Sequence, residues 1–154
     1  LYSGTVGAAL EGRGLALPSI AISAAAFHQP GSKESMEPNY ETAAQVVLDL
    51  ITNYDLGVID SSIVLNVNTP NLDFSSDLKY NITSIGTWGA RIPPIVEQTK
   101  DQVTYWTSHR ENFPSNKDNV DIVVLEKNEI SISPIYPKFS NEEFLNKSFS
   151  LKKK

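Results

Sequence analysis

The 154-residue chain contains no cysteine. This absence excludes disulfide bonds, thiolate metal ligands and cysteine nucleophiles, and it fits the reducing cytoplasm, where we expect the protein to reside. Histidine is nearly absent as well, since His28 and His109 are the only two. A zinc site needs several ligands at short spacing, so neither histidine indicates one. His28 falls in a polar loop and is typical of a solvent-exposed side chain, and nothing specific supports His109 as a general base.

Long apolar runs and an excess of positive charge are also missing. No apolar run reaches the roughly 20 residues of a membrane helix, so we expect no membrane partner. The formal net charge is −5, whereas a duplex DNA or RNA partner requires lysine and arginine to neutralise phosphates. Nothing matches the G-x-x-x-x-G-K-[ST] phosphate loop. These absences leave an acidic globular domain, or part of one, that binds no duplex nucleic acid.

The first residues form the most informative pattern that is present. Ser3, Gly4 and Thr5 precede a run of small residues that predicts a short helix over residues 5–11. The first N–H groups of a helix have no internal partner and lie at the positive end of its dipole, so they favour an anion. Serine and threonine also cap helices that bind nothing. The pattern alone therefore leaves a phosphate cradle and an ordinary helix cap both open.

The remainder predicts an α/β domain. Residues 20–22 form an apolar run typical of a parallel strand buried on both faces. Residues 40–54 carry an apolar stripe at helical spacing, formed by Ala43, Val46, Val47, Leu50 and Ile51. We further expect strands over residues 63–67 and 130–135, and a short helix through Lys127 with Asp121 as its N-cap.

The composition changes after Ser62 toward serine, threonine, asparagine and aromatic residues. We expect a strand over residues 81–88 and a hairpin of residues 95–98 and 102–107, which together predict an antiparallel excursion from the core. Its aromatic residues could stack a nucleobase, but a subunit interface explains them better. They are Trp88, Tyr105, Trp106 and Phe113.

The acidic side chains form no convincing catalytic pair. Glu34, Glu37 and Glu41 could bind a metal, but they are more typical of solvated carboxylates that favour a helix N-terminus. Asp118 and Asp121 are explained in the same way by a loop and a helix cap. We therefore assign no catalytic residue and no metal ligand within the chain.

Three stretches together resemble the SurE family of stationary-phase survival proteins. They are YSGTVGAALEG followed by LPSIAIS in residues 2–23, LNVNTPNL in residues 65–72, and ISISPI in residues 130–135. The resemblance covers roughly residues 1–137. It implies a three-layer Rossmann-like domain with an extended antiparallel hairpin. It also implies a metal-dependent 5′-nucleotidase that hydrolyses nucleoside 5′- or 3′-monophosphates, with Ser3, Gly4 and Thr5 at the phosphate.

The same resemblance carries an expectation about the missing metal ligands and the assembly. Family members hold Mg²⁺ or Mn²⁺ through residues upstream of the Ser-Gly-Thr turn, so we expect this chain to be the C-terminal part of the enzyme and to be inactive alone. We expect residues 1–61 to be core, 62–116 a hairpin arm for oligomerisation, and 117–154 a return to the core. The family further implies a homodimer or homotetramer. The alternative is a non-catalytic oligomerisation module with the same fold.

Overall fold

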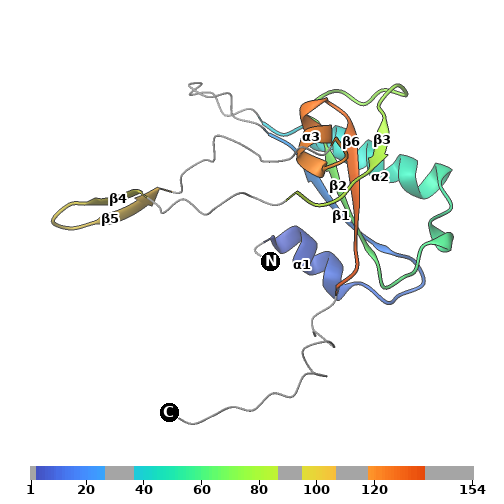
Figure 1. Ribbon diagram of the computed structural model, residues 1–154, viewed down its shortest axis with the longest axis horizontal. Coiled ribbons are helices and arrows are strands. Elements are labelled where there is room, and N and C mark those ends of the chain that lie inside the picture. The colour runs from blue at the N-terminus through green and yellow to red at the C-terminus, as the bar shows by residue number, and fades with distance from the viewer. Residues whose placement is uncertain (1–2, 27–36, 87–94, 107–117, 138–154) are drawn as a thin grey trace, which may run out of the picture.

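The computed structural model describes residues 3–26, 37–86, 95–106 and 118–137 (Figure 1). The helices are α1 (Gly4–Glu11), α2 (Tyr40–Asn53) and α3 (Asp121–Glu126), with a 3₁₀ turn η1 (Leu56–Val58). The strands are β1 (Ser19–Ala24), β2 (Val64–Thr69), β3 (Tyr80–Ile82), β4 (Ile95–Gln98), β5 (Val103–Trp106) and β6 (Ile130–Ile135). None of the described helices has the length and apolar character needed to cross a membrane.

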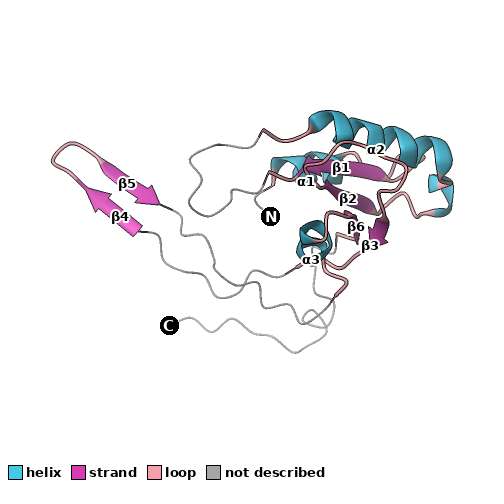
Figure 2. Cartoon of the chain, turned by 90° about the horizontal axis from the view of Figure 1, so that it is seen from above, coloured by secondary structure: helices cyan, strands magenta, loops and turns pink. Residues whose placement is uncertain are grey.

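Four strands form the core sheet in the order β1-β2-β6-β3. β1 runs parallel to β2, β6 runs antiparallel to β2, and β3 runs parallel to β6. β4 and β5 form a separate antiparallel ribbon that lies apart from this sheet in both views (Figures 1 and 2). The mixed sheet with its covering helices confirms the predicted α/β class.

One face of the sheet is apolar and packs against α2. Helix α2 begins where predicted because the Asn39 side chain accepts a hydrogen bond from the Thr42 N–H at 2.9 Å. Val46 and Leu50 then turn inward onto Leu65 and Val67 of β2. The buried members of this cluster are Val46, Leu50, Leu56, Leu65, Val67, Ile130 and Ile132.

The opposite face packs against α1, and Figure 2 shows α3 on the side of the sheet away from α2. Ala9 and Leu10 of α1 form a small buried cluster with Ala21 of β1 and Val64 of β2. After α1 the chain turns through Gly14, whose φ of 85° is the left-handed region that glycine adopts without strain. Helix α1 thus packs across one face of the sheet, and the chain then continues into β1.

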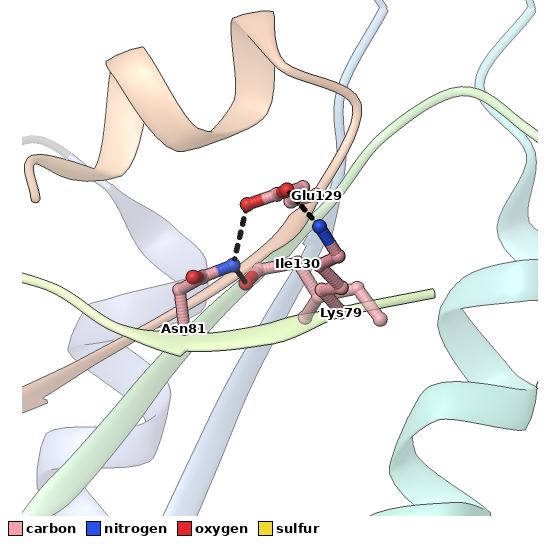
Figure 3. Close-up of polar contacts among 4 residues, drawn as sticks. All are labelled: Lys79, Asn81, Glu129 and Ile130. Carbon is pink, nitrogen blue, oxygen red and sulfur yellow. Dashed lines mark hydrogen bonds and ion pairs between the residues drawn. The ribbon is translucent and has the colours of Figure 1, made fainter. Parts of the chain in front are cut away.

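The junction of β3 with β6 is fixed by one carboxylate (Figure 3). Glu129 accepts a hydrogen bond from Asn81 Nδ2 at 3.0 Å and pairs with Lys79 Nζ at 3.5 Å. Asn81 also donates to the Ile130 carbonyl at 3.4 Å. These contacts hold a three-residue strand in the sheet.

The predicted extent of the antiparallel arm was wrong at its start. We expected the arm to begin at residue 62, but β2 pairs with β1 and β6 in the core, and β3 pairs with β6. The strand predicted over residues 81–88 is shorter, because β3 ends at Ile82 and only an isolated bridge from Ser84 to Val120 follows. The predicted hairpin is present as β4 and β5, and its role in oligomerisation stays a prediction.

Other local predictions fail for reasons of tertiary packing. Asp121 is the first residue of α3 and not its cap, because its carboxylate accepts the Gly86 N–H at 2.8 Å from the facing loop. Ile51 of the predicted α2 stripe is exposed. Strand β1 has helices on both faces, as predicted, but only Ala21 is fully buried, because β1 lies at one edge of the described sheet.

Candidate functional site at the carboxyl edge of the sheet

Ser3 caps α1, which is one of the two roles that the sequence left open. Its backbone is extended, and its Oγ accepts a hydrogen bond from the Val6 N–H at 3.3 Å. The Ser3 carbonyl accepts from the Gly7 N–H at 3.0 Å. The N–H groups of Gly4 and Thr5 have no acceptor among the described residues, and both residues are exposed. The start of α1 therefore presents two donors to solvent, while residues 1 and 2 lie outside the described part.

The chain path places this helix end at the carboxyl edge of the sheet. Helix α1 ends at Glu11 and enters β1 at Ser19, so its N-terminus lies at the opposite edge, where β1 and β2 end. Figure 2 shows the N-terminal end of α1 beside the end of β1. Helix α2 enters β2 in the same way, so both helices begin at this edge. Open α/β sheets bind their ligands there.

A polar row crosses the α1 face of the sheet at this edge. Ser23 of β1 is in register with Asn68 of β2, which is in register with Ser131 of β6, and Ser131 with Asn81 of β3. Residues in register point to the same face. Sequence reasoning missed this row, although the strict alternation of asparagine and apolar residues in residues 65–68 was the available signal.

Part of the polar row is fully satisfied and structural. Ser131 and Ser133 are fully buried, and each hydroxyl lies 2.8 Å from Thr83 Oγ1. Thr83 is itself buried at the end of β3. This hydroxyl network ties β3 to β6 and leaves no group for a ligand.

A concave feature lies at the start of α2. A cavity of about 390 Å³ is lined by Asn39, Glu41, Thr42, Gln45, Asp73 and Phe74. Its rim is clamped by Asn71, which accepts the Asn39 N–H at 2.8 Å and donates to the Glu37 carbonyl at 3.2 Å. The nearby Thr69 Oγ1 is buried without a partner in the described part of the chain. In the sequence, Asn71 is recognisable only as part of the LNVNTPNL motif, and this clamp was not predicted.

The other candidates are dispersed. Glu37 and Glu41 are exposed, and Asp118 lies 4.0 Å from Lys127 at the surface. The described ranges hold no group of three histidine, cysteine, aspartate or glutamate side chains able to bind a metal. Tyr105 is 66% exposed on β5. Several predicted candidates fall outside the described residues, namely His28, Glu34, Trp88, His109 and Phe113.

Comparison with known proteins gives this edge its context. The family model described as "Survival protein SurE" matches residues 1–91. The chain belongs to the SurE family. The match includes the capped start of α1 and all of β1, α2, β2 and β3, so the start of α1 and the carboxyl ends of β1 and β2 lie in the matched part of the chain.

Curated SurE relatives match most of the chain but only about half of their own length. Proteins named "5'-nucleotidase SurE" are 31% identical over 88% of the chain in Haemophilus influenzae and 32% identical over 96% in Kosmotoga olearia. The chain spans 51% and 55% of these two relatives. The crystal structure of the SurE protein from Aquifex aeolicus matches 94% of the chain and 55% of its own, with 27% identity and a TM-score of 0.63. The likeness confirms the SurE-like α/β fold.

Proposed function

We propose that the protein is a SurE-type phosphatase that hydrolyses nucleoside 5′- and 3′-monophosphates in the cytoplasm. Membership of the family and the relatives named 5′-nucleotidase support the reaction class. The observation that carries the proposal is the start of α1, where two N–H groups without described acceptors lie at the carboxyl edge. Such a helix end is suited to a phosphate dianion.

Within the proposal, α1 binds and orients the phosphoryl group. The N–H groups of Gly4 and Thr5 donate to phosphoryl oxygens, and the Thr5 hydroxyl adds a third donor. Ser3 positions these donors, because its side chain holds the first turn by accepting the Val6 N–H. These groups are fixed before the substrate arrives, so they stabilise the charge that develops on the oxygens without reorganisation. No side chain here acts as a nucleophile.

The proposal includes a divalent cation, Mg²⁺ or Mn²⁺, which in such enzymes polarises the phosphoryl group. The described residues do not fit such an ion, because no three suitable ligands come together among them. We therefore derive no step through the metal from this chain.

The test is phosphate release by the complete purified protein. We expect release from nucleoside 5′-monophosphates and 3′-monophosphates with Mg²⁺ or Mn²⁺, and loss of release when EDTA removes the cation. A protein that releases no phosphate from either substrate under any of these conditions is not a nucleotidase.

A second candidate function, that of a non-catalytic oligomerisation module, rests on the β4–β5 ribbon. A lone two-stranded ribbon is marginal in water, yet apolar residues on both its strands are exposed. These are Ile95 at 61%, Val96 at 52%, Val103 at 45% and Tyr105 at 66%. We propose that a second copy of the protein covers them in a homodimer or homotetramer, an assembly that both candidate functions share.

Light scattering tests the assembly. Replacing Val96 and Tyr105 together by serine should lower the native mass at micromolar concentration. The matched control replaces Glu97 and Thr104, the neighbours of Val96 and Tyr105 on the same strands, by serine as well. It should leave the native mass unchanged. A wild-type protein that is already monomeric would refute the interface.

A further inference from the structure

Two asparagines of β2 differ from four other asparagines of the described chain. Asn39, Asn71, Asn81 and Asn119 all donate or accept through their side-chain amides. Asn66 and Asn68 are half-buried on the sheet, and neither amide has a hydrogen-bond partner among the described residues. The half-buried Ser23 hydroxyl, in register with Asn68, has none either. Asparagine is disfavoured in strands, and a sheltered polar group without a partner costs free energy, so packing alone does not explain these side chains.

Asn68 and Ser23 lie at the level of the start of α1. Leu10 of α1 packs in one cluster with Val64, the first residue of β2. Going back from Leu10 to Ser3 moves about 10 Å along the helix axis. The same distance along β2 is about three residues and ends near Val67. Since α1 covers the face on which Asn68 and Ser23 stand, these two side chains and the exposed donors of α1 share one face and one edge.

The two groups of donors have different chemistry. The N–H groups of α1 only donate, which suits phosphate oxygens that only accept. The Asn68 amide both donates and accepts, and so does the Ser23 hydroxyl. A sugar hydroxyl also does both, and neutral groups beside a phosphate site do not repel the dianion. The pair is therefore matched to a hydroxyl-bearing group attached to the phosphate.

We propose that Asn68 and Ser23 form a subsite for the ribose hydroxyls of the substrate. This inference rests on the proposed function, since it assigns a second part of the same nucleotide. The two residues contact the sugar and orient it, and they take no part in transferring the phosphoryl group.

The test compares two phosphate monoesters that differ in the sugar, ribose 5-phosphate and phenyl phosphate. In the complete protein, Asn68→Ala should lower kcat/KM for ribose 5-phosphate about tenfold, as expected for one lost hydrogen bond. For phenyl phosphate it should change by less than about twofold. Ser23→Ala should show the same selective loss. The matched control is Asn53→Ala, which removes an exposed amide at the other end of α2. It should leave kcat/KM unchanged for both substrates.

Equal losses on both substrates would overturn the inference, because a merely structural role or a phosphate contact affects both alike. The absence of any loss would overturn it too. If the wild-type protein hydrolyses neither ester, the proposed function is still decided by phosphate release from the nucleoside monophosphates, and calorimetric titration with ribose 5-phosphate and phenyl phosphate decides the subsite separately. Asn68→Ala should then weaken binding of ribose 5-phosphate alone, and a wild-type protein that binds neither ligand has no such subsite.

Discussion

The two faces of β2 carry different kinds of residue. On one face Leu65 and Val67 are buried against α2, and on the other Asn66 and Asn68 are half-buried without described partners. Successive residues of a strand point to opposite faces, so a single four-residue segment contributes to the apolar core and to the polar edge. The apolar face therefore stabilises the fold, whereas the polar face is less well packed and presents groups that can bind a ligand.

The largest effect on stability is expected on the apolar face. Ile130 is fully buried, and Ile130→Ala should lower the free energy of unfolding by about 2–5 kcal/mol, from lost apolar contacts and the cavity left behind. The measurement is urea unfolding of the complete protein. Ile82→Ala is the control, since Ile82 is 64% exposed and its loss should cost only about 0.5 kcal/mol. Equal effects of the two substitutions would contradict the assignment of the core.

A smaller loss is expected in the hydroxyl network. Thr83→Val keeps the shape of the side chain but removes the shared partner of Ser131 and Ser133, which are buried. The free energy of unfolding should fall by about 1–3 kcal/mol. Chemical denaturation measures the loss. An unchanged midpoint would mean that the two serines bond equally well without Thr83.

The contact between α2 and β3 gives a prediction about pH. The Tyr80 hydroxyl donates to Asp49 Oδ2 at 2.6 Å. This hydrogen bond, helped by one from Asn53, lowers the pKa of the Asp49 carboxyl, and burial together with Asp49 raises the pKa of Tyr80. The lowered pKa of Asp49 stabilises the fold above about pH 4, the ordinary value, and that stability is lost as the pH falls through the folded value.

Tyr80→Phe should therefore cost about 1 kcal/mol at neutral pH, the usual worth of a partly exposed hydrogen bond. Because the raised pKa keeps Tyr80 protonated, the difference between wild type and variant should stay constant from about pH 5 to 9. It should shrink below about pH 4 as Asp49 takes up a proton. Thermal unfolding at several pH values measures this difference in stability. If the difference grows on acidification, the hydrogen bond from Tyr80 to the Asp49 carboxylate does not stabilise the fold as described.

The smallest effect on stability is expected on the polar face. Asn68→Ala removes no described hydrogen bond, so the free energy of unfolding should change by less than about 0.5 kcal/mol. The measurement is the same urea titration as for Ile130. A loss above about 1 kcal/mol would show that Asn68 supports the fold and would remove the contrast between the two faces.

The sequence predicted elements whose signals are local. Asn39 before an apolar helical stripe predicted α2, the alternation in residues 130–135 predicted β6, and a polar turn between two short apolar runs predicted the β4–β5 hairpin. Ser3 was correctly placed at the start of α1. The role of Ser3, Gly4 and Thr5 at a phosphate stays a prediction.

Features that depend on distant residues could not be read in this way. The position of β2 between β1 and β6 follows from pairing with a strand more than 60 residues away. Asp121 looks like a helix cap in the sequence, but Gly86 recruits its carboxylate and Val120 takes the cap position. The sequence shows Asn68 only as one residue of a motif. Its place beside Ser23 follows from the pairing register of β1 with β2.

The most direct test of a phosphate site at the start of α1 is the turnover of Thr5→Val in the complete protein. Thr5 is exposed, and valine keeps its shape while removing the hydroxyl, so the stability should be unchanged. If the start of α1 binds the phosphoryl group, kcat should fall on the order of a hundredfold, as for the loss of one donor to transition-state charge. A kcat equal to that of the wild type, at equal stability, would show that Thr5 belongs to a helix cap and to no active site.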